Sequence, residues 1–310
     1  MKVEMIANPL VSVVVVTYNS SKTVIETLNS IEAQTYDNIE LIVSDDYSRD
    51  NTVDLVKVWL EEHRDRFVRT ELLTINANTG TAGNLNRGFN RAKGEWIKGI
   101  AGDDKLVCTC IHSNIEYIRN NSNVEILLSK VKLIGDSELI KKYQNLFIYG
   151  ALELQRRELL KLLLTGNFLP ASTLFISKNV YDDLDGFDES MPLLEDWPFW
   201  IKALFNKKEI SFNNEYTTLY RLSESSVSMS STPNPLYLSS LKVFNDFYLP
   251  RYQWKISKLI WFHCKCNKAI TTKSHIMKIV LYIMLYINPF TYYKKYLYSK
   301  AYKLNNAYED

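Results

Sequence analysis

Residues 96–104 read WIKGIAGDD, an apolar stretch followed by two small residues and then the carboxylates Asp103 and Asp104. The pattern predicts a buried strand that reaches the surface where the two acids stand. Two adjacent carboxylates at a strand end suit a divalent cation whose other ligands are phosphate oxygens, and a solvated turn is the plainer alternative. The stretch therefore points to nucleotide chemistry.

Strand and helix signals alternate on both sides of this stretch. Apolar runs at 11–16, 39–43 and 68–75 predict strands, and capped amphipathic segments between them predict helices. This alternation is typical of an α/β fold with a doubly wound, mostly parallel sheet, whose ligands bind beyond the carboxyl ends of the strands. Further along we expect helices near 106–120, at 152–164 and from Ser177, with strands near 124–134 and 171–176.

The composition allows a large folded core and excludes disordered and fibrous classes, because 46% of the 310 residues are hydrophobic and 23% are charged. Charge is unevenly distributed: residues 251–310 sum to +9, whereas residues 1–250 sum to −7. A Ser- and Pro-rich stretch at 223–235 marks the expected boundary. We predict one domain over 1–235 and a basic, aromatic-rich helical extension over 236–310.

The first residues and the cysteines indicate the compartment. The N-terminal apolar run follows acids and a proline and is rich in β-branched residues, so it predicts a strand, not an export signal. We therefore expect a cytoplasmic protein with reduced thiols. The pairs Cys108–Cys110 and Cys264–Cys266 have one-residue spacing, which is not the usual structural zinc pattern, and plain thiols are the preferred interpretation.

The basic tail leaves two interpretations open. It includes HIMKIVLYIMLYINPF at 275–290, whose uninterrupted apolar part, Ile279–Ile287, is too short to span a bilayer. The segment is either a helix lying in the membrane interface or a helical extension packed on the core with a basic outer face. Nucleic-acid binding is not expected, because no recognised module accompanies the charge.

Two polar clusters follow the first two predicted strands. In VVTYNSS at 15–21, Tyr18 could stack on a base or simply pack against its neighbours. In IVSDDYSRDNT at 42–52, Asp45 and Asp46 follow a strand, where a carboxylate could accept the N–H of a uracil ring or could cap a loop or helix.

A further cluster, GFDESMPLLEDWPFW at 186–200, places Glu195 and Asp196 at a predicted helix start beside Trp197 and Trp200. The helix dipole accounts for one carboxylate at that position. It does not account for the two tryptophans. Indole rings there would exclude water and offer a stacking surface to a sugar, which suits a general base that acts on a hydroxyl.

In order and spacing, these segments resemble family 2 glycosyltransferases, the inverting GT-A enzymes of bacterial polysaccharide assembly. The resemblance covers about residues 10–230 and includes NTGTAGNLNRGFNRAKGEWIKGIAGDD in the middle and YRLSESSVS behind. It implies metal-dependent transfer of a sugar from a nucleotide diphosphate donor, with a UDP-sugar favoured. The implied acceptor is a hydroxyl of a saccharide or a lipid-linked saccharide, and contact with the inner face of the cytoplasmic membrane would suit the second.

The resemblance also implies roles for donor-side residues. Tyr18 and Asp46 correspond to positions that hold the uracil ring, with Thr17 beside them. Asp104 corresponds to the residue that binds Mn²⁺ or Mg²⁺. Asp103 corresponds to a residue that binds the ribose or belongs to the coordination shell of the metal.

On the acceptor side, Asp196 corresponds to the catalytic base and Glu195 to a supporting neighbour. On the donor side, Arg221 would face the pyrophosphate or pair with a nearby acid. Two positions depart from the family pattern: Ala101 stands where many relatives have the first Asp of the metal signature, and Ser223 stands where relatives often carry His. Metal affinity would therefore depend on Asp103 and Asp104 alone.

Two other functions remain open from the sequence. A nucleotidyltransferase that makes an activated sugar would share the fold, but such enzymes usually carry a Gly-rich basic phosphate loop, and TYNSSKT at 17–23 contains no glycine. A catalytically silent relative could instead act as an assembly partner through its basic tail. The presence of Asp46, Asp103, Asp104 and Asp196 argues against this.

Overall fold

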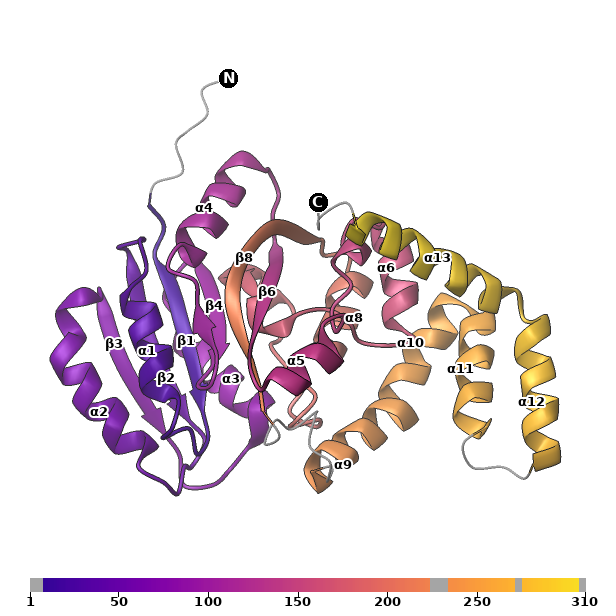
Figure 1. The fold of residues 1–310 in the computed structure, drawn as a ribbon, viewed down its shortest axis with the longest axis horizontal. Helices are drawn as coiled ribbons and strands as arrows, with labels where there is room; N and C mark the ends of the chain where they lie inside the picture. Colours follow the sequence, from indigo (N-terminus) through magenta and orange to yellow (C-terminus); the bar gives the residue numbers. More distant parts are fainter. Residues whose placement is uncertain (1–7, 224–233, 271–274, 307–310) are drawn as a thin grey trace.

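The computed structural model describes residues 8–223, 234–270 and 275–306, and its centre is one eight-stranded sheet (Figure 1). The strands are β1 (Val11–Thr17), β2 (Ile39–Asp45), β3 (Arg69–Thr74), β4 (Trp96–Ala101), β5 (Lys105–Leu106), β6 (Ile126–Gly135), β7 (Phe175–Ser177) and β8 (Ile210–Leu222). Their order is β3-β2-β1-β4-β7-β6-β8-β5. The β4–β7, β6–β7 and β5–β8 pairs are antiparallel and the others parallel, so the predicted α/β fold with a mostly parallel sheet is confirmed.

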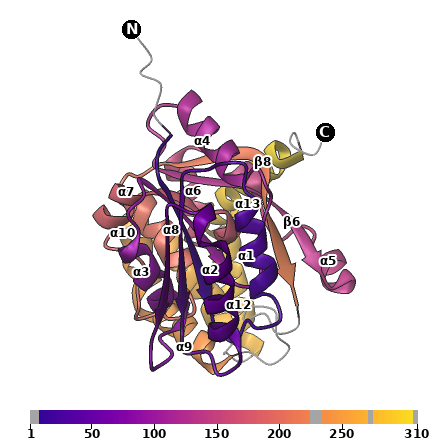
Figure 2. The ribbon, with the colours of Figure 1, turned by 90° about the vertical axis from the view of Figure 1, so that its left-hand side faces the viewer.

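Helices cover both faces of the sheet, and Figure 2 shows α3 and α1 on opposite sides of its first strands. In the first part of the chain they are α1 (Val24–Glu32), α2 (Thr52–His63), α3 (Gly80–Arg91), α4 (Cys110–Asn120), α5 (Ser137–Tyr143), α6 (Arg156–Leu163), α7 (Lys178–Asp183) and α8 (Asp196–Phe205). In the last part they are α9 (Pro235–Val243), α10 (Leu249–Ile256), α11 (Lys258–Ile270), α12 (His275–Ile287) and α13 (Pro289–Asn306).

Strand β1 shows why the sequence lacks polar alternation. Val13 and Val15 pack into a core with α1, α2 and α4, whereas Val14 and Val16 pack into the other core with α3 and α8. Because both faces of a parallel strand are covered, every position along VSVVVVT is buried and apolar side chains are favoured throughout.

Two local expectations differ from the structure in their bounds, and one strand was missed. The helix predicted near 106–120 begins at Cys110, because Lys105 and Leu106 pair with β8. The strand predicted over 171–176 is reduced to Phe175–Ser177 behind a short 3-10 turn. The long strand β8 was not predicted, although it carries side chains to the candidate site described below.

The C-terminal helices share a hydrophobic core with the first part of the chain. Leu297 and Ala301 of α13 are fully buried in the same core as α6 and α8. A Cβ at Gly150 would lie 2.1 Å from the Ala301 carbonyl oxygen, so glycine permits the close approach of α13. Lys300 also pairs with Glu158 at 2.8 Å. Helix α13 therefore packs on the core, whereas the choice between a membrane-interface helix and a packed extension for 275–290 stays open.

The predicted domain boundary at 223–235 lies almost wholly outside the described residues, and the division into 1–235 and 236–310 stays a prediction. Within the described ranges, we find no helix that combines the length and the apolar character needed to cross a bilayer.

Candidate active site

The acids Asp103 and Asp104 stand in the turn that follows β4, as predicted. Asp104 is 2% exposed, and its Oδ1 accepts a hydrogen bond from the backbone N–H of Arg221 on β8 at 2.8 Å. Its carbonyl oxygen accepts a bond from the Thr27 hydroxyl on α1 at 2.7 Å. The turn is thus held from two sides by elements distant in the sequence, which fixes where the carboxylate points.

The environment of this pair disfavours uncompensated negative charge. Burial raises the pKa of Asp103, and burial together with the charge of Asp103 raises the pKa of Asp104 well above its usual range. The hydrogen bond from Arg221 occupies one oxygen of Asp104 and leaves Oδ2 for another ligand. Two neighbouring carboxylates of this kind fit a divalent cation that takes its remaining ligands from phosphate oxygens.

Arg221 pairs with a nearby acid, which is the second of the two roles expected for it. Its Nε donates to the carbonyl oxygen of Asp103 at 2.8 Å, and its guanidinium pairs with Glu26 of α1 at 2.8 Å. The side chain therefore braces the acidic turn, and a contact with pyrophosphate stays a prediction.

The second acid pair begins helix α8, where Glu195 is the N-cap residue and Asp196 the first helical residue. Oδ1 of Asp196 accepts a bond from the Trp197 backbone N–H at 2.6 Å, and Oδ2 accepts one from the Asn167 side chain at 2.7 Å. Burial and the charge of Asp196 raise the pKa of Glu195 to about 8, and burial also raises the pKa of Asp196. At neutral pH the pair therefore favours one charge over two.

The two tryptophans differ in their surroundings. The indole N–H of Trp197 donates to the Leu163 carbonyl oxygen at 2.6 Å, and its ring packs against Phe244. Trp200 is fully buried, which leaves no ring face for a sugar, so the expectation of a stacking surface was wrong for this residue. Both still line the cavity beside the acids, and their role in excluding water stays a prediction.

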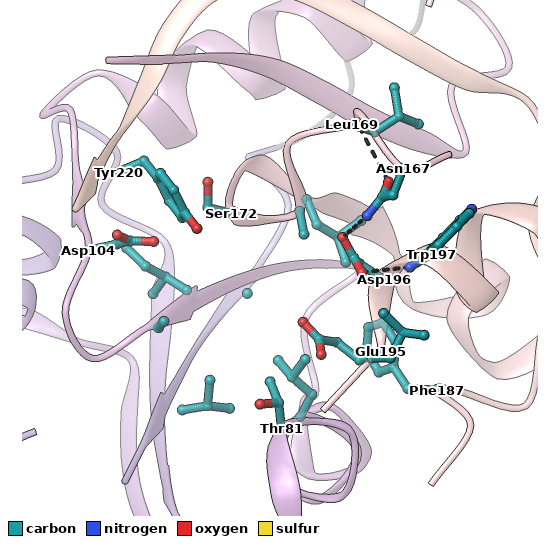
Figure 3. A pocket seen from close by; sticks show the side chains of 18 of the residues that line it. Thr81, Asp104, Asn167, Leu169, Ser172, Phe187, Glu195, Asp196, Trp197 and Tyr220 are labelled. Carbon is teal, nitrogen blue, oxygen red and sulfur yellow. Dashed lines mark hydrogen bonds between the residues drawn. The ribbon is translucent and has the colours of Figure 1, made fainter. Parts of the chain in front are cut away.

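The two acid pairs line the same cavity, which has a volume of about 680 Å³. In Figure 3, Asp104 lies on one wall and Asp196 on the other, and Glu195 points into the space between them. The hydroxyl of Tyr220 also points into this space, and the pKa of Tyr220 is raised by burial and then by the charges of both acid pairs. A reacting molecule in the cavity would therefore meet an acid pair on each side.

The residues predicted to hold the base of the nucleotide lie outside this lining. Tyr18 is 52% exposed just after β1, where its ring is accessible for stacking. The Thr17 hydroxyl donates to Asp45 at 2.8 Å, so Thr17 connects the ends of β1 and β2.

Asp46 is 2% exposed and faces the N-terminus of α3. Its carboxylate accepts bonds from the backbone N–H groups of Thr79 and Gly80 at 2.9 and 2.8 Å, and it pairs with Arg87 at 2.8 Å. This is the capping alternative, because these N–H groups belong to the helix start. Contact with uracil remains a prediction in addition to it.

Among the described residues, no three His, Cys, Asp or Glu side chains are grouped so that they could hold a metal ion. Cys108 is exposed and Cys110 is buried, so within this part of the chain the plain-thiol interpretation fits the first cysteine pair.

Sequence reasoning gave no role to several residues that line the cavity, among them Asn167, Tyr220 and Tyr237. Asn167 stands between Gly166 and the Phe-Leu-Pro segment that ends at Pro170, and a polar residue in such a loop is a weak signal. Tyr220 begins the YRLSESSVS segment that carries part of the resemblance, but no role of its own was predicted for it, because its placement depends on β8. Tyr237 lies on α9, beyond the segments that carried the resemblance.

Several known proteins are similar to this chain in sequence or structure. A 220-residue match is 27% identical to the UDP-Glc:alpha-D-GlcNAc-diphosphoundecaprenol beta-1,3-glucosyltransferase WfgD of Escherichia coli and covers 71% of this chain and 79% of that protein. The structure of S. aureus TarS 1-349 in complex with UDP-GlcNAc has a TM-score of 0.59 at 20% identity, over 97% of this chain and 91% of the other.

The mannosyltransferase PcManGT from Pyrobaculum calidifontis, solved with GDP-Man and Mn²⁺, has a TM-score of 0.52 at 16% identity, over 96% of this chain and 87% of the other. The two solved structures share the GT-A fold with this chain. The family model described as "Glycosyl transferase family 2" matches residues 12–183, more than half of the sequence. The chain therefore belongs to glycosyl transferase family 2 and is an enzyme of glycosyl transfer.

Proposed function

We propose that the chain transfers a sugar, with inversion, from a UDP-sugar to a hydroxyl of a saccharide or lipid-linked saccharide, in a reaction that depends on Mn²⁺ or Mg²⁺. The observation that carries the proposal is the placement of Asp104 and Asp196 on facing walls of one cavity. Inversion needs the leaving group and the base on opposite sides of the anomeric carbon, and an acid pair on each wall of the cavity supports such an arrangement.

On the donor side, Asp104 and Asp103 would hold the divalent ion together with the diphosphate oxygens. A bound ion would neutralise the charge that develops on the departing diphosphate. Arg221 keeps the acidic turn in place through its bond to the Asp103 carbonyl oxygen and is near enough to add positive charge. Tyr18, Thr17 and Asp46 would form the base subsite at the ends of β1 and β2.

On the acceptor side, Asp196 would remove the proton from the attacking hydroxyl. Its carboxylate is fixed by Asn167 and by the Trp197 backbone N–H, so its orientation is set before an acceptor arrives. Glu195, whose pKa is raised to about 8, would remain protonated beside it and limit the local negative charge. Trp197 and Trp200 would keep water away from the donor.

The donor and acceptor classes are supported by the relatives. WfgD is named for a UDP-Glc donor and a diphosphoundecaprenol-linked acceptor, and the TarS structure contains UDP-GlcNAc. We extend both classes to this chain and propose that it works at a membrane surface, where a lipid-linked acceptor resides.

The test is metal-dependent hydrolysis of a panel of UDP-, dTDP- and GDP-sugars by the purified chain. We expect hydrolysis of a UDP-sugar with Mn²⁺ or Mg²⁺ and none after chelation, and Asp196→Asn should abolish it. Release of pyrophosphate from UTP and a sugar phosphate would instead indicate nucleotidyl transfer. No turnover of any donor, with intact folding, would favour a catalytically silent assembly partner.

A further inference from the structure

Helix α12 carries an apolar surface that the rest of the described chain leaves uncovered. It lies at the end of the molecule farthest from α2 (Figure 1). Eight of its side chains are 38–72% exposed: Met277, Ile279, Val280, Tyr282, Ile283, Met284, Tyr286 and Ile287. Leu285 is buried on the opposite side, where α12 packs on α11 and α13. Single exposed apolar residues are ordinary, but a contiguous patch of this kind marks a binding surface.

Helix α13 continues this surface with a different chemistry. Its exposed side chains include Tyr292, Lys295, Tyr296 and Lys303, whose three-, four- and seven-residue spacings place them on one side of the helix. The ring centroids of Tyr286 on α12 and Tyr292 on α13 lie 6.0 Å apart, so the two surfaces are continuous. The mostly aliphatic surface of α12 is therefore bordered on α13 by exposed tyrosine and lysine side chains.

The charge of this region selects the occupant. Residues 258–306 contain nine lysines and no aspartate or glutamate. A second copy of the chain would bring a second set of positive charges, including Lys295 and Lys303, to the same region, and like charges would repel. An anionic lipid surface instead attracts the lysines, accepts the aliphatic side chains into its acyl boundary, and places tyrosine at the headgroup level where this residue is favoured.

We propose that the apolar face of α12 inserts into the headgroup region of an anionic membrane, with the Tyr–Lys side of α13 lying against the lipid headgroups. The purpose of this docking rests on the proposed lipid-linked acceptor, which it would bring within reach of the cavity. The docking itself needs only the exposed side chains and the lysines named above.

The test uses the full chain and vesicles of phosphatidylcholine, alone or mixed with phosphatidylglycerol. We expect co-sedimentation with the mixed vesicles and much weaker binding to phosphatidylcholine alone. The double variant Ile283→Ser and Ile287→Ser should bind the mixed vesicles at least about 10-fold more weakly, because it removes aliphatic surface that would be buried in lipid. Both side chains are more than half exposed, so the fold should tolerate the changes.

Two further variants sharpen the result. Lys295→Glu with Lys303→Glu should weaken binding and reduce its salt dependence, since the lysines supply the electrostatic part. Val58→Ser with Val68→Ser is the matched control, because these valines are also more than half exposed but belong to the α2–β3 end of the molecule. The control should bind like the parent chain.

Three results would overturn the inference: no binding to anionic vesicles, equal binding by the Ile283 and Ile287 variant, or a dimer in sedimentation velocity that this variant disperses. Donor hydrolysis separates this inference from the proposed function. A chain that binds vesicles but hydrolyses no donor would contradict the function alone, whereas one that hydrolyses a UDP-sugar without binding vesicles would contradict the docking alone.

Discussion

The side-chain amide of Asn167 donates a hydrogen bond to Oδ2 of Asp196 at 2.7 Å, and this bond fixes the carboxylate on the cavity wall. Asn167 belongs to the loop between α6 and β7, whereas Asp196 begins α8, so the contact links two parts of the fold. The remaining oxygen accepts the Trp197 backbone N–H at 2.6 Å. The proposed base is thus positioned by one side chain and one peptide group.

Asn167→Ala should slow transfer without weakening donor binding. A hydrogen bond to a charged group contributes about 1.5–3 kcal/mol, so we expect kcat to fall by roughly 10- to 100-fold. The bond from Asn167 lowers the pKa of Asp196, and its loss should therefore shift the acid limb of the pH–rate profile to higher pH. Asn206→Ala is the control, because Asn206 lies at the exposed end of α8, the helix that Asp196 begins. An unshifted profile would show that Asn167 does not act through the carboxylate.

Asp196 and Glu195 should respond differently to removal of their charge. Asp196→Asn should retain UDP binding and lose about 100- to 10,000-fold in transfer, the range of general base catalysis. Glu195→Gln should change transfer little, because the raised pKa of Glu195 already keeps this side chain protonated at neutral pH. Transfer rates and UDP calorimetry on both variants provide the comparison. The reverse ranking would make Glu195 the base.

Glu195 should also make the folded state less stable as the pH rises. Burial raises the pKa of Glu195 to about 8 in the folded protein, whereas a glutamate in the unfolded chain has a pKa of about 4.3. Between these two pH values the folded protein therefore binds one more proton than the unfolded chain. Stability from this group is therefore complete below about pH 4 and lost as the pH approaches 8. Thermal unfolding at pH 5 and pH 8 should show a steeper loss for the parent chain than for Glu195→Gln. Parallel curves would mean that Glu195 is ionised in the folded protein.

Much of the fold was predictable because the first half follows local rules. The buried run at Val11–Thr17 and the acids after Ala101 can be recognised from sequence, since burial on both faces of a strand requires apolar residues throughout. Strand β8 was not recognised, because ISFNNEYTTLYRL mixes polar and apolar residues and pairs with β6 through an irregular register. Its role depends on tertiary pairing, which no local pattern contains.

The same distinction applies to the site. The acids Asp104 and Asp196 were identified from their motifs, and the structure places both on one cavity. Asn167 was missed because its partner is 29 positions away and only the folded chain brings them together. Family membership decides for glycosyl transfer over the nucleotidyl and silent alternatives, a choice that the acids alone left open.

Asp104→Asn should lose the metal-dependent part of UDP affinity. Two unit charges about 4 Å apart interact by roughly 4 kcal/mol at an effective dielectric constant of about 20, so the loss of one carboxylate should weaken UDP binding with Mn²⁺ by up to about 1,000-fold. Because burial raises the pKa of Asp104, protons compete with the metal and affinity should also fall at low pH. Calorimetry with and without Mn²⁺ measures both effects. Unchanged affinity in the variant would remove Asp104 from the metal site.

Asp46→Ala separates the capping role of this carboxylate from its proposed contact with uracil. The side chain is buried, accepts the Thr79 and Gly80 N–H groups and pairs with Arg87. Removing one partner of a buried pair costs about 3–5 kcal/mol, so we expect the melting temperature to fall on the order of 5–10 °C.

UDP affinity of the same variant, measured well below its melting temperature, then tests the second role. A loss of affinity with Mn²⁺ absent points to the base subsite, because the metal no longer contributes to binding. Thr52→Ala, at the start of α2, is a control for helix-start changes outside α3. If Asp46→Ala melts like the parent chain, the cap is unimportant for stability, and if it melts earlier but binds UDP normally, Asp46 acts through α3 and not on uracil.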